Sequence, residues 1–186
     1  MQVRCGKDLV IEFHPQFFPP GSVEPRYRLH DGVYAEFLTN MRESSMRLDS
    51  VADGYRYFAI EGQYAGVVRL DLNHSHAVCK RIANYTGVGR NFTFESSEVH
   101  LTSAELTELS GLIHEVDFWA LDTVTPVDAL GGRHHVVEAS VGGRYHVVDR
   151  WCPSDTPIGE LCEFFVRIHK RAWGIVDRSW WQKWLP

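Results

Sequence analysis

The pattern of hydrophobic and polar positions is clearest in the second half of the chain. Four apolar residues recur there at the spacing of one helical face: Leu106, Leu109, Ile113 and Val116. Thr102 and Glu105 precede them in the Thr-x-x-Glu arrangement, in which two side chains satisfy the backbone N–H groups that a helix start leaves free. We therefore predict an amphipathic helix over residues 103–117.

Two alternating segments, 134–141 and 144–151, follow this helix on either side of Gly142-Gly143. Glycines accept the positive φ angles of a tight primed turn, so the two segments are predicted to pair as a hairpin. Beyond the hairpin, Thr156 and Pro157 fit the N-cap and the first position of a second helix, over 157–170. The apolar stripe of that helix consists of Ile158, Leu161, Cys162, Phe165 and Ile168.

The first hundred residues read mainly as short strands separated by turns that contain glycine or proline. The segments predicted as strands are 9–13, 27–30, 33–37, 55–61, 65–72, 78–85 and 91–95. Asp31-Gly32 suits the type I′ turn of a hairpin between two of them, 27–30 and 33–37. Residues 42–52 fit a short helix or a loop equally well.

These elements predict an α+β fold: a mainly antiparallel sheet built of hairpins, with two amphipathic helices, at about 103–117 and 157–170, packed on it. A chain of 186 residues suits one domain, 1–186. A division of that domain into a strand-rich sub-lobe, 1–98, and a helix–hairpin–helix sub-lobe with a Trp-rich tail, 99–186, stays open at this point.

Composition narrows the class of protein. Hydrophobic residues make up 44% of the chain and charged residues 23%, as in globular domains. The formal net charge of −5 argues against a general nucleic-acid binder and is compatible with a basic or neutral protein partner. The chain shows no apolar run of the length of a membrane span and no signal-peptide pattern, so we expect a cytoplasmic protein.

The four cysteines are widely scattered, at Cys5, Cys79, Cys152 and Cys162, and no Cys-x-x-Cys pair is present. This distribution indicates reduced, mostly buried thiols rather than a zinc site or a redox motif. We expect no cofactor.

The hairpin over 134–151 carries groups suited to acid–base chemistry. Strand alternation places Glu138 diagonal to Tyr145 on one face and His146 on the other. A carboxyl group among aliphatic neighbours can act as an acid or a base, so an enzyme with a site around Val136–Trp151 is one hypothesis. The interpretation that we favour is structural, with Glu138 bonded to a tyrosine or to a helix end.

Ten histidines raise the question of a metal site. His74 and His76 are expected on one strand face, with Asp71 nearby and His134 or His135 as a third ligand from a distant segment. Zinc needs three or four converging ligands, and the spacing supplies only two. Solvated loop histidines and no bound metal are therefore the prediction.

Three of the six tryptophans, Trp180, Trp181 and Trp184, fall in the last seven residues. An exposed cluster of this kind would suit a partner-binding surface or a membrane interface. We favour a tail that docks back on the core, because exposed tryptophans promote aggregation.

The C-terminal third resembles small uncharacterised bacterial proteins. The similarity rests on short stretches: Asp117-Phe118-Trp119, Val137-Glu138-Ala139, and the run from Gly143 to Pro153. The resemblance implies a bacterial, cytoplasmic protein and brings no activity with it.

Two functions are compatible with these features. The first is a non-enzymatic protein-binding domain, for example a bacterial immunity protein that neutralises a toxin by direct binding, with its acidic charge steering it to a basic partner. The alternative is an enzyme with an acid/base site on the Val136–Trp151 hairpin. The oligomeric state stays open.

Overall fold

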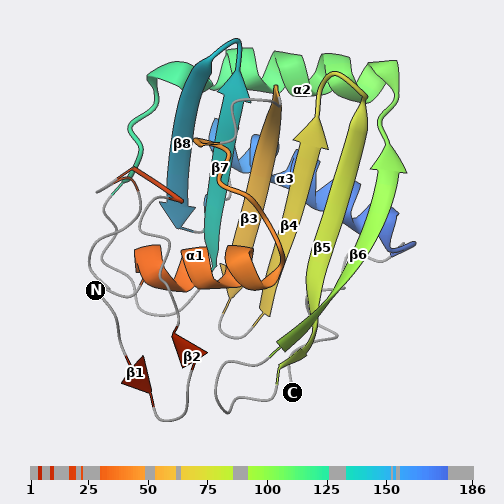
Figure 1. Cartoon of the computed structure of the whole chain (residues 1–186). Coiled ribbons are helices and arrows are strands. Elements are labelled where there is room, and N and C mark those ends of the chain that lie inside the picture. The colour runs from red at the N-terminus through yellow and green to blue at the C-terminus, as the bar shows by residue number, and fades with distance from the viewer. Residues whose placement is uncertain are drawn as a thin grey trace.

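A six-stranded antiparallel sheet forms the centre of the protein (Figure 1). The computed structural model describes residues 4–5, 9–10, 17–19, 22, 30–48, 53–61, 64–85, 92–125, 133–151, 153 and 156–175. The sheet consists of β3 (Gly54–Glu61), β4 (Tyr64–Asp71), β5 (His76–Tyr85), β6 (Phe92–His100), β7 (His134–Val141) and β8 (Arg144–Trp151). Their order across the sheet is β6-β5-β4-β3-β7-β8. Two short strands, β1 (Arg4–Cys5) and β2 (Leu9–Val10), pair separately.

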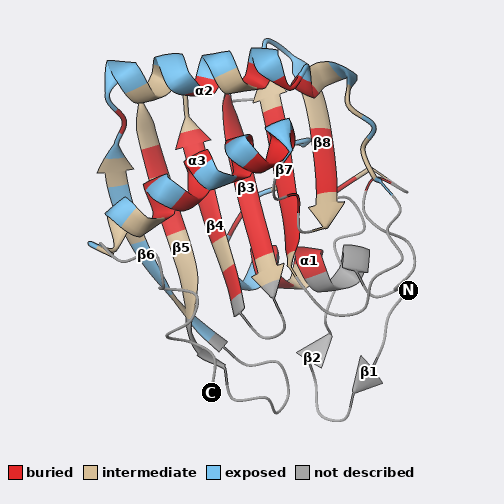
Figure 2. Cartoon of the chain, turned by 180° about the vertical axis from the view of Figure 1, so that it is seen from behind, coloured by how far each residue is buried: buried red, intermediate tan, exposed pale blue. Residues whose placement is uncertain are grey.

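Helices cover both faces of this sheet (Figures 1 and 2). Helix α2 (Ser103–Glu115) and helix α3 (Pro157–Ala172) pack on one face, and helix α1 (His30–Asn40) lies on the other. The α+β fold predicted from the sequence, an antiparallel sheet of hairpins with two helices packed on it, is confirmed. Strand β3 pairs with β7, so one continuous sheet joins the segments 1–98 and 99–186.

The local signals in the second half act as predicted. Thr102 accepts a hydrogen bond from the Glu105 backbone N–H, and the Glu105 side chain accepts one from the Thr102 N–H, which completes the capping box. Thr156 caps α3, with Pro157 at the first helical position. Gly142 and Gly143 have φ angles of 59° and 74°, as the primed turn requires.

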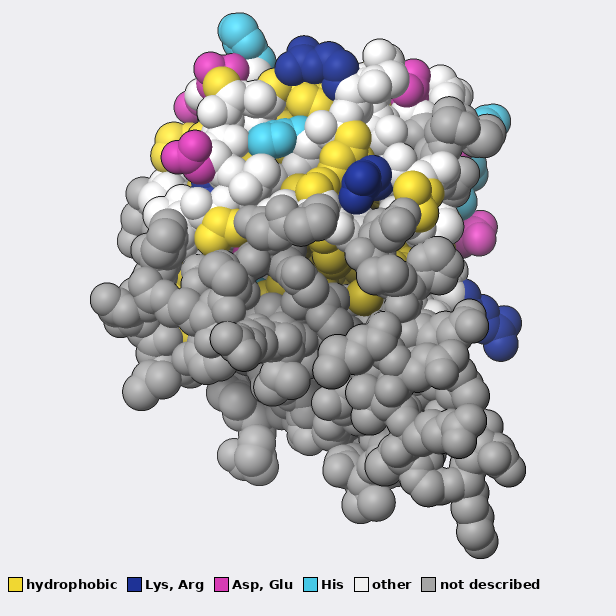
Figure 3. Space-filling model, turned by 60° about the vertical axis from the view of Figure 1, so that its left-hand side comes forward, with side chains coloured by type: hydrophobic (Ala, Val, Ile, Leu, Met, Phe, Trp, Pro, Cys, Tyr) yellow, Lys and Arg dark blue, Asp and Glu magenta, His cyan; other side chains and the backbone are white. Residues whose placement is uncertain are grey.

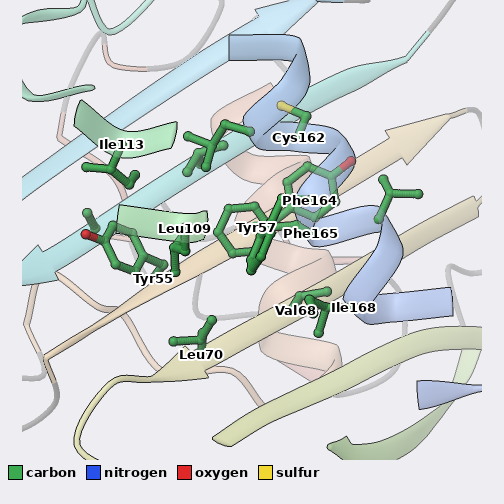
Figure 4. Packing of buried hydrophobic residues seen from close by; sticks show 14 of the residues in the cluster. Tyr55, Tyr57, Val68, Leu70, Leu109, Ile113, Cys162, Phe164, Phe165 and Ile168 are labelled. Carbon is green, nitrogen blue, oxygen red and sulfur yellow. The ribbon is translucent and has the colours of Figure 1, made fainter. Parts of the chain in front are cut away.

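The larger core lies between the sheet and the pair α2–α3. Tyr57 on β3 stacks on Phe165 of α3, with ring centroids 5.4 Å apart and planes 3° from parallel (Figure 4). The predicted apolar stripe of α3 is buried, and so are Leu109, Ile113 and Val116 of the α2 region. Figure 2 shows the buried positions gathered on the middle strands and on the inward side of α3.

The predicted hairpin around Asp31-Gly32 is wrong, because helix α1 occupies His30–Asn40. Tyr34, Leu38 and Met41 recur every three or four residues, and each is at most 1% exposed. They pack against the opposite face of the sheet, on Phe58 of β3 and its neighbours. The free energy gained by burying this helical stripe outweighs the local preference of Asp-Gly for a turn.

The other first-half strands are confirmed and extended. The predicted pair 55–61 and 65–72 corresponds to β3 and β4, and the weaker candidates 78–85 and 91–95 to β5 and β6. Of the segment 42–52, residues 42–48 form a loop with turns at 42 and 46–48. Residues 49–52 lie outside the described part, as do 11–13 and 27–29. None of the described helices is long and apolar enough to cross a membrane.

Two glycines offer a matched test of this packing. A Cβ at Gly54 would lie 2.1 Å from the Leu70 carbonyl oxygen of β4, whereas a Cβ at Gly111 on α2 would have nothing within 4 Å. We expect Gly54→Ala to lower the free energy of unfolding by about 1–3 kcal/mol through overpacking. Gly111→Ala should raise it by up to about 1 kcal/mol, the difference in helix propensity. Urea denaturation measures both, and equal effects would contradict the described β3–β4 spacing.

Candidate functional site

A buried ion pair lies on the α1 side of the sheet. Arg56 on β3 stands directly opposite Glu138 on β7, and its Nε donates to Glu138 Oε2 at 2.6 Å. Tyr145, diagonal to Glu138 on β8, donates its hydroxyl to Oε1 at 2.7 Å. The side chains of Arg56 and Glu138 are 0% and 1% exposed. Both carboxylate oxygens of Glu138 therefore have partners and are closed to solvent.

The same arginine reaches the connection between α1 and β3. Its Nη1 donates to the Ser44 carbonyl oxygen at 2.6 Å, and its guanidinium lies 5.2 Å from the centre of the Phe17 ring. Glu43, also buried, accepts a bond from Lys80 Nζ at 2.6 Å and lies 3.7 Å from Arg56 Nη1. The cluster thus ties β3, β5 and β7 to the segment that follows α1.

This cluster keeps Tyr145 protonated. Burial raises the pKa of the Tyr145 hydroxyl, and the neighbouring Glu138 carboxylate raises the pKa further. Sequence alternation predicted the contact between Glu138 and Tyr145, but Arg56 was missed. Its only signal was a cation inside an otherwise aromatic and apolar strand, and pairing over 82 residues has no local signature.

The remaining acid–base candidate of the hairpin, His146, lies on the other side of the sheet. The ring of His146 faces the residues after α2, with its Nε2 3.0 Å from the Leu121 carbonyl oxygen and its ring 5.2 Å from Phe118. Burial lowers the pKa of His146. The sheet therefore separates His146 from Glu138 and Tyr145, and a catalytic role for any of them stays a prediction.

The expected arrangement of His74 and His76 on one strand face is wrong. His74 lies in the turn before β5, where its Nδ1 is 2.9 Å from Asp71 Oδ2. His76 begins β5, lies 3.3 Å from a Glu98 carboxylate oxygen and packs on His100 at 5.4 Å. Ser75 between them has a φ of 50°, which interrupts the strand alternation. Among the described residues, no three potential ligands converge to hold a metal ion.

The tryptophan cluster Trp180, Trp181 and Trp184 lies outside the described residues. Trp173, which precedes it, caps the C-terminus of α3. The Arg81 guanidinium of β5 lies over the Trp173 ring, 4.1 Å from its centre. The chain at the end of α3 is thus held against β5.

The pair α2–α3 has an uneven distribution of charge. The two helices run antiparallel, since Arg167 contacts Glu108 and Arg171 contacts Glu105. At the other end, four exposed carboxylates, Glu115, Asp117, Glu160 and Glu163, form no ion pair with any described residue. We call these four residues the acidic end of the helix layer.

Aromatic and cationic side chains lie next to the acidic end. Trp119 follows α2 in the 3-10 helix η1 (Phe118–Ala120), and the Arg144 guanidinium of β8 lies 4.5 Å from its ring centre. Figure 3 shows this side of the molecule, with hydrophobic side chains between cations and histidines and with acidic side chains along the margin. Aromatic residues and arginines of this kind are typical anchors of protein interfaces.

A cavity of about 550 Å³ opens between α2 and the start of α3. Its walls include His135 of β7, Leu112 of α2, and Glu160 and Glu163 of the acidic end. Volumes of roughly 300–1,000 Å³ are usual for ligand sites. No pattern in the sequence indicates this cavity, because it is formed by three elements that are distant in the chain.

A comparison with models of known protein families and with curated proteins finds no match to this chain. The resemblance of the C-terminal third to small bacterial proteins stays a prediction.

The buried ion pair generates a test of its structural role. Glu138→Leu leaves the Arg56 guanidinium buried without its counter-charge, and we expect a loss of about 3–5 kcal/mol in the free energy of unfolding. Tyr145→Phe removes one hydrogen bond and should cost about 1 kcal/mol. The double variant Arg56→Met/Glu138→Leu removes both charges and should be more stable than Glu138→Leu alone in urea denaturation. A double variant no more stable than that single one would contradict the pairing.

The lowered pKa values of two buried histidines predict how the free energy of unfolding depends on pH. Burial is the main cause that lowers the pKa of His135 to about 3 and that of His169 to about 4. In the unfolded chain both have a pKa near 6.5, so below pH 6.5 the unfolded state binds protons that the folded state does not. The free energy of unfolding should therefore fall as pH decreases from about 6.5 to 5, by up to about 1.4 kcal/mol per pH unit for each histidine.

Urea denaturation at intervals of half a pH unit measures this slope. The two histidines together contribute to the slope of the free energy of unfolding against pH. Replacing one of them, by His135→Gln or His169→Gln, should remove about half of that contribution. The lowered pKa values of Asp71 and Glu105 place the titration of these two carboxyl groups below this window. An unchanged slope in both variants would contradict neutral, buried histidines.

Proposed function

We propose that the protein is a non-enzymatic binding domain that recognises a basic protein partner through the acidic end of its helix layer. The single observation that carries this proposal is the group of four exposed carboxylates without an ion pair among the described residues. Unpaired carboxylates on one side of a protein steer a basic partner to that side and speed association. Trp119 and Arg144 beside them supply the kind of anchor that an interface needs.

An immunity protein that neutralises a toxin by direct binding is the concrete form of this proposal. A small acidic inhibitor suits a basic toxin such as a nuclease, whose active surface carries positive charge for its substrate. The sealed position of Glu138 supports a binding function over the acid/base alternative, since a carboxylate with both oxygens occupied has no vacant site for a substrate.

The thiols support the cytoplasm as the location. Cys79 and Cys162 are both buried and free. Burial raises the pKa of Cys79 to about 12 and raises the pKa of Cys162 as well, so both stay protonated and unreactive. Free, inert thiols agree with a reducing compartment.

A binding experiment with matched charge variants tests the proposed surface. The protein serves as bait in an extract of its native host, where we expect one basic partner, captured in stoichiometric amount and encoded by a neighbouring gene. With that partner purified, Glu160→Lys/Glu163→Lys should slow association at least about tenfold at low salt, with the effect shrinking as salt screens the charges.

Glu98→Lys is the matched control for each of the two charge reversals made singly, because Glu98 lies on β6, at the opposite edge of the sheet from β8, and is 69% exposed. It should leave the association rate within about twofold. Recovery of no stoichiometric partner would count against a binding function. Equal slowing by the control would show that net charge, rather than the acidic end, determines binding.

A further inference from the structure

The cavity between α2 and the start of α3 has an ordered polar group at its inner wall. His135 is 6% exposed, and its Nδ1 lies 2.8 Å from the Tyr57 hydroxyl. Burial raises the pKa of Tyr57 well above its usual value, so the hydroxyl keeps its proton. His135 Nδ1 is the one hydrogen-bond partner of that hydroxyl among the described residues. The hydroxyl therefore donates to Nδ1.

This bond decides which nitrogen of His135 carries the hydrogen. Because Nδ1 accepts, the neutral ring has its N–H at Nε2. Within the described part of the chain, Nε2 has no hydrogen-bond partner, and His135 lines the cavity. An N–H group that lines a cavity and has no partner in this part of the chain is open to an acceptor on a ligand or to a water molecule. The inner wall thus offers an oriented N–H to an acceptor group.

Positive charge also lines the cavity. Arg133 lines the cavity, and its charge contributes to the lowered pKa of His135. The N-terminal turn of α3, with Thr156 and Gly159, also lines it and adds the positive end of a helix dipole. An anionic oxygen that accepts from His135 Nε2 would be stabilised by both.

The mouth of the cavity has the opposite character. Glu160 and Glu163 line it, both exposed and without an ion pair among the described residues, whereas Glu108 is already paired with Arg167 at 2.5 Å. Two uncompensated carboxylates repel a dianion such as phosphate and attract a cation. The cavity therefore combines an acceptor-binding inner end with a cation-binding mouth.

We propose that this cavity binds a carboxylate with a cationic group beside it, the chemistry of a basic amino acid or of a basic residue at a polypeptide C-terminus. The carboxylate accepts from His135 Nε2 near Arg133, and the cationic group lies between Glu160 and Glu163. Tyr57 is a positioning residue, because it fixes the ring of His135 without lining the cavity. The site depends on these residues alone and does not require the protein partner proposed above.

Titration with three probes, followed by NMR of the labelled protein and by calorimetry, tests the site. The probes are L-arginine, N-acetylglycyl-L-arginine with a free carboxylate, and the same dipeptide as its C-terminal amide. We expect the dipeptide acid or L-arginine to shift the His135 ring signals, and the amide to bind at least about tenfold more weakly, since it lacks the charged acceptor. Binding of L-arginine alone would indicate a free amino acid, and binding of the dipeptide acid a polypeptide terminus.

Variants separate the site from nonspecific charge effects. His135→Phe should weaken binding at least about tenfold, and Glu163→Gln, an exposed change that spares the fold, several-fold. Tyr57→Phe should weaken binding and shift hydrogen from Nε2 toward Nδ1 of His135 in the ring nitrogen spectrum, a change that lost packing alone would not produce. Glu98→Gln is the matched control for charge and should have no effect.

Three results would overturn the proposal: no binding of any probe at millimolar concentration, equal affinity for the acid and the amide, or unchanged affinity in both His135→Phe and Glu163→Gln. None of these results depends on whether a protein partner is recovered, so the two proposals fail separately.

Discussion

The ion pair between Arg56 and Glu138 is the interaction that the register of the sheet depends on. A buried charge without its counter-charge costs several kcal/mol, and β3 and β7 avoid this cost only in the observed register, with the two residues directly opposite. A slip by one residue would turn Arg56 toward the apolar core under α2 and α3. The pair therefore specifies how the two halves of the chain join, since β3 belongs to the first half and β7 to the second.

Because side chains alternate along a strand, the two faces of the sheet carry different kinds of side chain. Tyr55 and Tyr57 point toward α2 and α3, where the contacts are almost wholly apolar. Arg56, between them, points toward α1 and the segment that follows it, where Glu43, Glu138 and Lys80 are held in a charged cluster. Burial of apolar side chains stabilises both faces, and the charged cluster on the α1 face adds the directional bonds that favour one arrangement.

The features that could be predicted from the sequence are those whose determining residues are close together. The capping box at Thr102, the Gly142-Gly143 turn and the diagonal contact of Glu138 with Tyr145 are all set by spacings of a few residues. Prediction failed where a distant segment decides the outcome. Helix α1 forms because the sheet offers an apolar face on which Tyr34 and Leu38 are buried. No single segment of the sequence indicates that face. The same holds for the pairing of Arg56 with Glu138 and for the cavity at His135.

The charges of the helix layer support a role in recognition on energetic grounds. Cations near the C-terminus of α3 and Glu105 near the N-terminus of α2 complement the helix dipoles, and the antiparallel packing brings them into ion pairs. Glu115 does the opposite, since it is the last residue of α2, where negative charge costs about 0.3–1 kcal/mol, whereas Glu160 in the first turn of α3 complements the dipole of that helix. Carboxylates that form no ion pair among the described residues and oppose the helix dipole do not stabilise the fold. Their placement beside Trp119 is more readily explained by a cationic group on a binding partner, because the attraction to that cation would offset the unfavourable electrostatic energy in the free protein.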